Sequence, residues 1–368
     1  MAESTRAVSR RSGLRPRAEV VLAAILFGAA TPLSKALLSE VHPIVLAGLL
    51  YLGAGLGAAL MLTVRGSFVR RDAQRARFGW ERRDVLALAG AILAGGVVAP
   101  IVMMYGLRAA PAATASLLLN FEIVATALIA AAVFREAIGG RAWVAVGLIT
   151  TAGCILAWRA NEPWGMSVGV LGIVGACVLW GLDNNLTRVV SAKNPIAIVC
   201  VKGLVAGSIT VGLGMVVGAG LPPLGISAAA MALGSVGFGA SIALYIRALQ
   251  DLGAARTGAL FGVAPFFGAL VSMVIFPEAP GALVLGALPL MAAGAALLFA
   301  EAHRHSHRHP ELVHDHRHSH EDGHHDHVHE SGEPLTGTHH SHPHRHEPMT
   351  HDHPHTPDLH HRHDHPSA

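Results

Sequence analysis

The chain has 368 residues, of which 52% are hydrophobic and only 14% are charged, and its mean hydropathy is +0.47. This balance excludes an ordinary soluble domain, in which about 25% of the residues are charged. The formal net charge of +3 does not indicate nucleic acid as a partner, because the arginines gather at the ends of apolar runs and no basic face is interleaved with aromatic residues.

Apolar runs fill the chain from Val20 to Ala300. Each is close to the length of about 20 residues that a helix needs to cross the hydrocarbon core of a lipid bilayer. Spanning segments must be helical, because open strands would leave backbone groups unpaired in lipid. We therefore expect an all-α integral membrane protein with ten transmembrane helices, at residues 19–38, 44–64, 85–107, 112–134, 142–158, 168–188, 196–217, 227–246, 256–276 and 282–301.

The loops differ in their positive charge. The basic N-terminus, 1–18, the arginine-rich loop 65–84 and the loops after the fourth, sixth and eighth spans carry most of the Lys and Arg residues, whereas the opposite loops offer only Arg108 and Arg159. Positive residues are retained on the cytoplasmic side of a membrane. This asymmetry predicts that both termini of this multi-pass protein are cytoplasmic.

An internal repeat divides the apolar part into two five-span copies, 19–160 and 165–301. The corresponding segments are 27–35 with 180–188, 42–44 with 194–196, and 134–136 with 276–278. Because five is an odd number, the second copy should enter the membrane from the opposite face, which gives the inverted repeat of alternating-access carriers. Chance similarity between apolar helices is the alternative, and the matching polar and proline positions weigh against it.

Two Gly-containing stretches occupy equivalent places in the copies, Gly28 to Pro32 and Gly181 to Asn185. We expect unwound backbone there, lining a cavity.

Polar side chains inside the spans are candidates for a substrate and proton pathway, because a charge at the bilayer centre costs about 2.5–3.5 kcal/mol or more. The carboxylates Glu122 and Asp183 are candidate proton carriers, since burial opposes their charged form. The competing interpretation is that they form salt bridges with Lys202 or Arg188 that lock the helices together. The full candidate set is Glu122, Asp183, Asn120, Asn184, Lys202, Arg188 and Thr31.

The C-terminal tail, 302–368, has a different composition, since all but one of the 25 histidines lie between His303 and His365. So polar a segment cannot bury enough surface to offset its conformational entropy, and we expect disorder. Neutral imidazole suits transition-metal ions such as Ni, Co and Zn. The candidate metal ligands are His303, His305, His307, His309, His314, His316, His318, His320, His324, His325, His327 and His329. An extension without a function and a cloning artefact are the alternatives, and the interspersed Asp and Pro argue against a purification tag.

Several motifs are absent from the sequence. There is no GxxxxGK[ST] loop and no dinucleotide-binding pattern, so ATP-driven pumping is not expected and a gradient is the expected energy source. There is also no HExxH or nucleophile-elbow pattern that would indicate an enzyme. We expect no required cofactor.

The motif FGAATPLSKALL followed by HPI, and the stretch AAPAATASLLLNFEIVATALIAAAVFREAI, resemble the EamA family of the drug/metabolite transporter superfamily. The second copy repeats the pattern in YIRALQDLGAARTGALFGVAPFFGALVSMVIFPEA, and the resemblance covers about 19–301. It implies a ten-helix inverted-repeat carrier of bacterial inner membranes that exports amino acids, metabolites or drugs. Two departures weaken the substrate inference: Tyr51 lies in a second span that lacks the family's frequent Arg, and Glu122 is followed by Ile123 where Glu-Pro is common.

These observations predict a secondary active transporter that couples efflux of a small solute, an amino acid or another metabolite, to protons. A nickel or cobalt exporter is an alternative, in which the tail collects ions near the entrance. The spans contain no His, which counts against it. A membrane-anchored metal buffer or sensor is the alternative of another class, and deletion of the residues after Ala300 would separate it from a carrier. The sequence does not reveal the oligomeric state, and a homodimer stays open.

Overall fold

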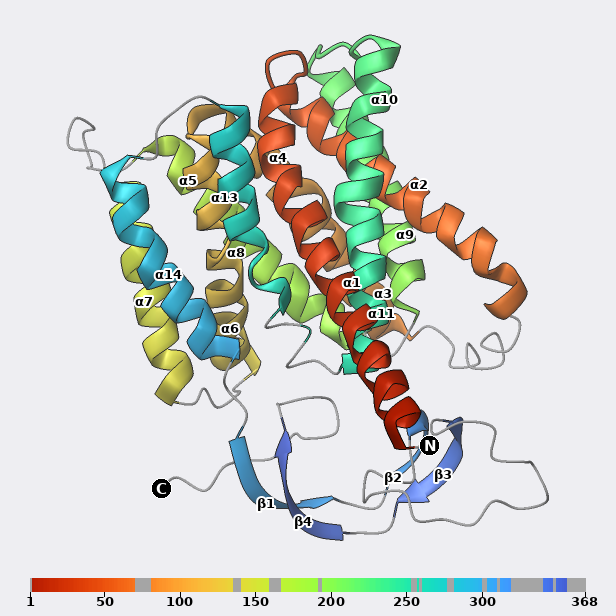
Figure 1. Ribbon diagram of the computed structural model, residues 1–368. Helices are drawn as coiled ribbons and strands as arrows, with labels where there is room; N and C mark the ends of the chain where they lie inside the picture. The colour runs from red at the N-terminus through yellow and green to blue at the C-terminus, as the bar shows by residue number, and fades with distance from the viewer. Residues whose placement is uncertain are drawn as a thin grey trace. The chain divides into compact units, whose positions relative to one another are not determined.

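The structure is a computed structural model that describes the helical part at residues 2–69, 81–134, 140–158, 167–190, 194–252, 257, 260–276 and 281–299. In the C-terminal part it describes 303–309, 312–318, 340–346 and 349–355. The chain divides into two compact units, Met1–Glu301 and Ala302–Ala368, and each is described by itself (Figure 1).

The first half of the helical unit contains seven α-helices and a π-helical segment. They are α1 (Ala2–Leu37), α2 (Pro43–Val69), α3 (Arg82–Ala91), the π-helical η2 (Ile92–Val98), α4 (Ala99–Ala109), α5 (Ala112–Leu118), α6 (Phe121–Phe134) and α7 (Gly140–Ala157). The segments α3, η2 and α4 are continuous and form one long helix where a single span is predicted, and α5 and α6 together cover the next one.

The second half repeats this order. Its elements are α8 (Val168–Val189), α9 (Pro195–Val216), α10 (Leu224–Leu233), the π-helical η3 (Gly234–Ala240), α11 (Ser241–Leu252), α13 (Ala264–Ile275) and α14 (Ala282–Phe299). The predicted spans agree with these helices to within a few residues at most ends. The first and the ninth are exceptions, because α1 begins at Ala2 rather than near residue 19 and α13 begins at Ala264 rather than near residue 256.

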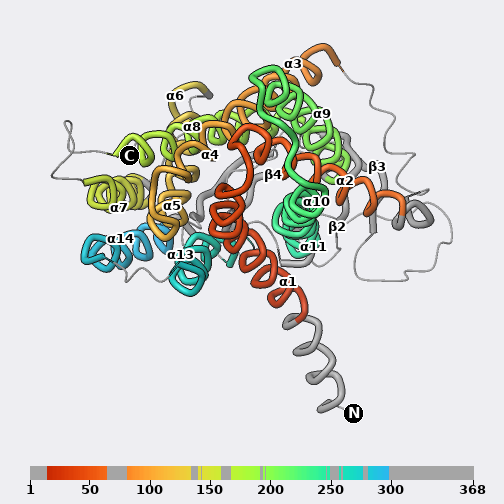
Figure 2. The backbone as a smooth tube through the Cα atoms, turned by 90° about the horizontal axis from the view of Figure 1, so that it is seen from above, coloured from red at the N-terminus to blue at the C-terminus, as the bar shows by residue number. Residues whose placement is uncertain are grey.

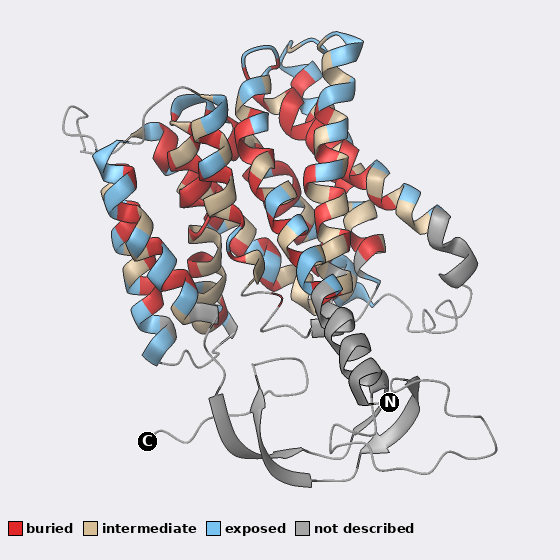
Figure 3. Cartoon of the chain, viewed as in Figure 1, coloured by how far each residue is buried: buried red, intermediate tan, exposed pale blue. Residues whose placement is uncertain are grey.

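Seven helical stretches in the described part of the chain are long and apolar enough to cross a membrane. Three further apolar helices are shorter: Trp143–Ala157, Ala264–Ile275 and Ala282–Leu297. The full count of ten transmembrane helices therefore stays a prediction. Large apolar side chains such as Leu60, Val133 and Leu224 are exposed on the outer helix faces, as expected of a surface that meets lipid (Figure 3).

The irregular segments of the helices fall at matching places in the two halves. When Phe134 is aligned with Phe276, the ends of η2 fall on the ends of η3. A turn at 119–120 separates α5 from α6, and a turn at 262–263 precedes α13 at the equivalent place to within one residue. The repeat is therefore visible in backbone geometry as well as in sequence.

The breaks expected at Gly28–Pro32 and Gly181–Asn185 are not present, because α1 and α8 run through these stretches without interruption. The glycines permit close helix crossings instead. A Cβ atom added at Gly28 would lie 2.2 Å from the carbonyl oxygen of Ala264. The interruptions occur in the fourth and ninth predicted spans.

The first helix of each half packs against the other half. Helix α8 contacts α3, η2, α4 and α6, and α1 contacts η3, α11 and α13. Glycines line the crossing of α2 and α9, where Gly55 and Gly203 bring the two backbones together. Helix α7 lies beside α14 at one edge (Figure 2). The two halves thus share one core, which includes Leu46, Leu107 and Ile173.

The tail contains four strands of seven residues. Strand β1 (His303–His309) pairs antiparallel with β4 (Met349–His355), and β2 (Leu312–His318) pairs antiparallel with β3 (His340–His346). The prediction of disorder is wrong for these four segments. Their histidines alternate with other residues, and a period of two matches the geometry of a strand. The remaining tail residues lie outside the described part.

Candidate functional site

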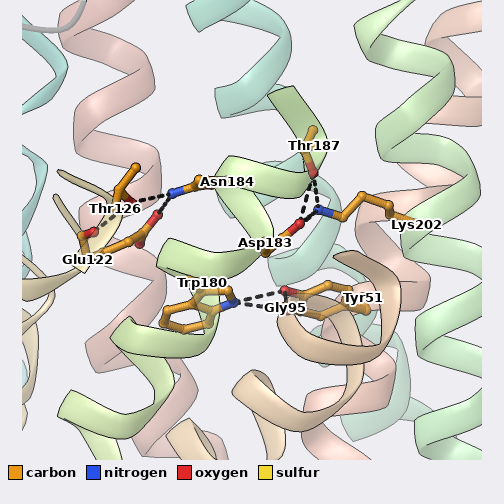
Figure 4. A network of polar contacts seen from close by, with 9 residues as sticks. All are labelled: Tyr51, Gly95, Glu122, Thr126, Trp180, Asp183, Asn184, Thr187 and Lys202. Atoms are coloured by element: carbon orange, nitrogen blue, oxygen red, sulfur yellow. Dashed lines mark hydrogen bonds and ion pairs between the residues drawn. The ribbon is translucent and has the colours of Figure 1, made fainter. Parts of the chain in front are cut away.

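Helix α8 carries most of the candidate site on one stretch, Trp180 to Arg188, of which Figure 4 shows Trp180, Asp183, Asn184 and Thr187. Gly181 lets α6 approach closely, because a Cβ atom added there would lie 2.8 Å from the backbone nitrogen of Thr126. This crossing brings the carboxylate at the start of α6 within reach of the amides of α8.

The first cluster surrounds Glu122. The amide of Asn184 donates to Glu122 Oε1 at 2.9 Å and to Thr126 Oγ1 at 3.2 Å, and the Thr126 hydroxyl donates to the backbone carbonyl of Glu122 at 2.7 Å. Asn185 donates to the backbone carbonyls of Thr126, at 3.0 Å, and Gly181, at 2.8 Å. The side chain of Glu122 forms no ion pair with any described residue. Its recorded partner is a neutral amide.

A cleft of about 390 Å³ opens beside this cluster, between α6 and α8. Its polar lining comes from an acid, two amides, a hydroxyl and a guanidinium, and its apolar lining comes from small or branched side chains. The lining residues are Glu122, Ile123, Thr126, Ala127, Ala130, Asn184, Asn185 and Arg188. Four types of polar group, from five residues, therefore meet apolar surface in one cleft.

The second cluster lies on the other side of α8. Lys202, on α9, donates to the two carboxylate oxygens of Asp183 at 2.5 and 2.7 Å, and to Thr187 Oγ1 at 3.3 Å. The Thr187 hydroxyl donates to Asp183 Oδ1 at 2.9 Å. The Asp183 side chain is 8% exposed and that of Lys202 is 16% exposed. The charge of Asp183 is thus paired with that of a half-buried lysine, which agrees with the salt-bridge interpretation for this carboxylate.

A third group of contacts, around the carbonyl of Gly95, was not predicted from the sequence. The Tyr51 hydroxyl donates to the carbonyl of Gly95 at 2.7 Å, and Trp180 Nε1 donates to the same carbonyl at 3.0 Å. Gly95 lies in η2 and also contacts Asp183, since a Cβ atom added at Gly95 would lie 2.1 Å from Asp183 Oδ2. The polar atoms of Tyr and Trp usually need a partner when buried, which is a signal that could have drawn attention to Tyr51 and Trp180.

Two predicted residues do not join these clusters. Asn120 is fully buried at the turn between α5 and α6, where its amide donates to the Leu117 carbonyl at 3.0 Å and its side-chain oxygen has no hydrogen-bond partner. Thr31 is buried on α1. None of the hydrogen bonds recorded for the described residues joins either residue to Glu122 or Asp183. The predicted set is therefore distributed over several places rather than gathered around one cavity.

Among the described side chains, no group of three or more His, Cys, Asp or Glu residues could hold a metal ion. The side chains of all the predicted histidine ligands lie outside the described part of the chain.

Two stretches of the chain, residues 19–158 and 167–300, match the model of the EamA-like transporter family. The chain belongs to this family. As an EamA-like protein with long apolar helices, it is a multi-pass transporter that lies in the lipid bilayer. Its substrates are small molecules, and it is not an enzyme.

Similar proteins agree with this assignment. An uncharacterized transporter of Methanothermobacter thermautotrophicus is 28% identical over 271 residues, which cover 70% of this chain and 78% of that relative. A protein of known crystal structure shares the fold with a TM-score of 0.55 at 19% identity, over 76% of this chain and 95% of that one.

Proposed function

We propose that this transporter is a proton-coupled secondary carrier that exports a small organic solute, an amino acid or another metabolite, and that Glu122 carries the proton. The observation that supports this most is the contrast between the two carboxylates. Asp183 is bound to Lys202, whereas Glu122 faces an open cleft with a neutral amide as its recorded partner. A carboxylate without a fixed countercharge can bind and release a proton at lower cost than one held in an ion pair.

Asn184 suits this role. An amide presents a donor at one end and an acceptor at the other, so it can serve a charged carboxylate as donor and a protonated carboxyl as acceptor. The Thr126 hydroxyl is the second partner of this amide. The cluster can therefore pair with Glu122 in both protonation states.

The cleft is suited to a small polar solute. Its volume of about 390 Å³ falls near the lower end of the range for ligand pockets, about 300–1,000 Å³. Glu122 offers a charge complement to an ammonium group, Arg188 is a guanidinium at the same cleft, and Ile123 with Ala127 provides apolar surface. An amino acid has the complementary groups, which are an ammonium group, a carboxylate and, in many cases, an apolar side chain.

The proposal includes the direction and setting of transport. The family match in two stretches, and the packing of each first helix against the other half, support two repeats that move against each other in alternating access. We place the protein in the bacterial inner membrane with both termini cytoplasmic, as the distribution of Lys and Arg indicates.

Proton movement in liposomes tests the proposal. Protein is reconstituted into liposomes that contain a pH-sensitive dye, and the standard amino acids are added one at a time to the wild type, Glu122→Gln and Glu40→Gln. Glu40 is an exposed carboxylate and serves as the matched control. We expect at least one amino acid to drive proton flux in the wild type and in Glu40→Gln, and no flux in Glu122→Gln.

Flux that persists in Glu122→Gln would contradict the role of Glu122. No flux with any amino acid in the wild type would count against amino acids as the cargo.

Export of divalent metal ions is the second candidate function, favoured by the histidines of the tail. The same vesicles with nickel or cobalt ions, and with protein ending at Ala300, test it. Gradient-driven accumulation in the truncated form would support a metal carrier. Metal retention that depends wholly on the tail, without accumulation, would favour the buffer or sensor.

A further inference from the structure

The register of the tail strands places histidines opposite one another. In the first ribbon, formed by β1 and β4, the opposed pairs are His303 with His355, His305 with His353, and His307 with His351. In the second, formed by β2 and β3, they are His314 with His344, His316 with His342, and His318 with His340. Each ribbon therefore has three consecutive pairs of histidines.

Each set of pairs shares one face of its ribbon. Successive residues of a strand alternate between faces, and directly opposed residues of an antiparallel pair lie on the same face. In the first ribbon, His309 and Met349 complete the histidine face, and the fixed charges Arg304, Arg308 and Asp352 belong to the other face. The arginines are thus placed away from the face on which a cation would bind.

We propose that these two ribbons are metal sites, in which opposed histidine pairs bind divalent transition-metal ions such as Zn²⁺ or Ni²⁺. Opposed residues have Cβ atoms about 4.5–5.5 Å apart, whereas residues two apart on one strand are separated by about 6.6 Å. The nearest histidine to each of His303, His305 and His307 is therefore contributed by 351–355. Two imidazoles approach one ion to about 2.0–2.1 Å, and a neighbouring pair can complete four-fold coordination.

This arrangement makes metal binding depend on residues far apart in the sequence. In a flexible tail that binds metal through neighbouring histidines, the segment 303–309 alone, or 314–318 alone, would be sufficient for binding. The ribbons need 340–355 as well, which brings His340, His342, His344, His351, His353 and His355 into the ligand set. Metal binding and strand pairing should then stabilise each other, as metal sites and local folding generally do. The inference does not depend on which solute the helical unit transports.

The test follows amide hydrogen exchange and zinc content of the full-length protein in detergent micelles, with ZnCl₂ as the probe and MgCl₂ as a hard-cation control. One variant is His351→Ala/His353→Ala/His355→Ala, which leaves β1 unchanged. The matched control is His360→Ala/His361→Ala/His363→Ala, which removes three histidines outside the described strands.

We expect zinc, and not magnesium, to slow exchange of 303–309 by about tenfold or more in the wild type and in the control variant. The slowing should be lost in the His351/His353/His355 variant, although no residue of 303–309 has changed, and that variant should retain less zinc than the control. Equal slowing and equal zinc content in the two variants would overturn the proposal, as would zinc-independent exchange of 303–309 in the wild type.

Discussion

At the scale of single residues, the two carboxylates of the site have different surroundings and are expected to respond differently to substitution. Asp183 is buried and forms an ion pair with the half-buried Lys202 and a hydrogen bond with Thr187, whereas Glu122 is bound by the amide of Asn184 beside a cleft. We therefore assign a stabilising role to the first and a transport role to the second.

The ion pair gives a prediction about stability. Lys202→Met leaves Asp183 buried without its countercharge, a change that costs about 3–5 kcal/mol in buried pairs, whereas replacing both partners with apolar residues is often neutral. We expect the single variant to melt at clearly lower temperature in detergent and Asp183→Leu/Lys202→Met to recover most of the loss, with tryptophan fluorescence as the readout. A single variant that melts like the wild type would show that the pair contributes little.

The sequence identified these polar residues, but it did not predict which of them contact one another. Glu122, Asp183, Asn184 and Lys202 are recognisable because polar groups are costly inside a span. Which of the two carboxylates pairs with Lys202 depends on the rotation of α8 relative to α9, and no spacing along the chain determines that rotation. Asn120 illustrates the same limit, since its depth is predictable and its separation from the Glu122 cluster is not.

At the scale of elements, the π-helical η2 connects α2 with α8 through its Gly95. Its Gly95 presents a carbonyl to Tyr51 and Trp180 and leaves room for the carboxylate of Asp183. Three elements, α2, α8 and η2, therefore meet at one glycine.

This junction predicts the effect of a single methyl group. In Gly95→Ala, the new Cβ atom would lie 2.1 Å from Oδ2 and 2.4 Å from Cβ of Asp183, so η2 must move away from α8. We expect a loss of about 1–3 kcal/mol, as for overpacked cores, and weaker transport. Gly147→Ala is the matched control, because nothing lies within 4 Å of its added Cβ. Equal melting temperatures for the two variants, measured in the same detergent, would show that the contact is not tight.

Helix positions were largely predictable because runs of apolar residues determine them, but the breaks within helices were not. The glycines of α1 and α8 suggested unwinding, and the structure uses them for close crossings with α13 and α6. Glycine serves both purposes, and only the partner helix distinguishes them. In the tail, the period of two was visible in the sequence, and the pairing of its first part with its last was not.

At the scale of the whole molecule, the two repeats share their geometry but not their chemistry. The positions equivalent to Glu122 and Asp183 are Ala264 and Ala30, at the crossing of α13 and α1. There Phe27 contacts the rings of Phe238 and Phe261, at centroid distances of 5.6 and 5.4 Å. One crossing between the halves thus has two carboxylates where the equivalent crossing has alanines, which is consistent with a proton pathway in one of the two repeats.

The most direct test of the proposed mechanism compares two modes of transport by Glu122→Gln in the same liposomes. With a radiolabelled solute that drives proton flux in the wild type, one assay follows accumulation against a gradient, driven by protons, and the other follows exchange of labelled for unlabelled solute, which needs no net proton movement. Our account predicts that Glu122→Gln loses proton-driven accumulation and keeps exchange at saturating solute, with a higher KM for exchange because the charge complement to the ammonium group is lost. Accumulation at the wild-type level would contradict it, and so would equal loss of both modes at saturating solute, because Glu122 would then act in solute binding alone.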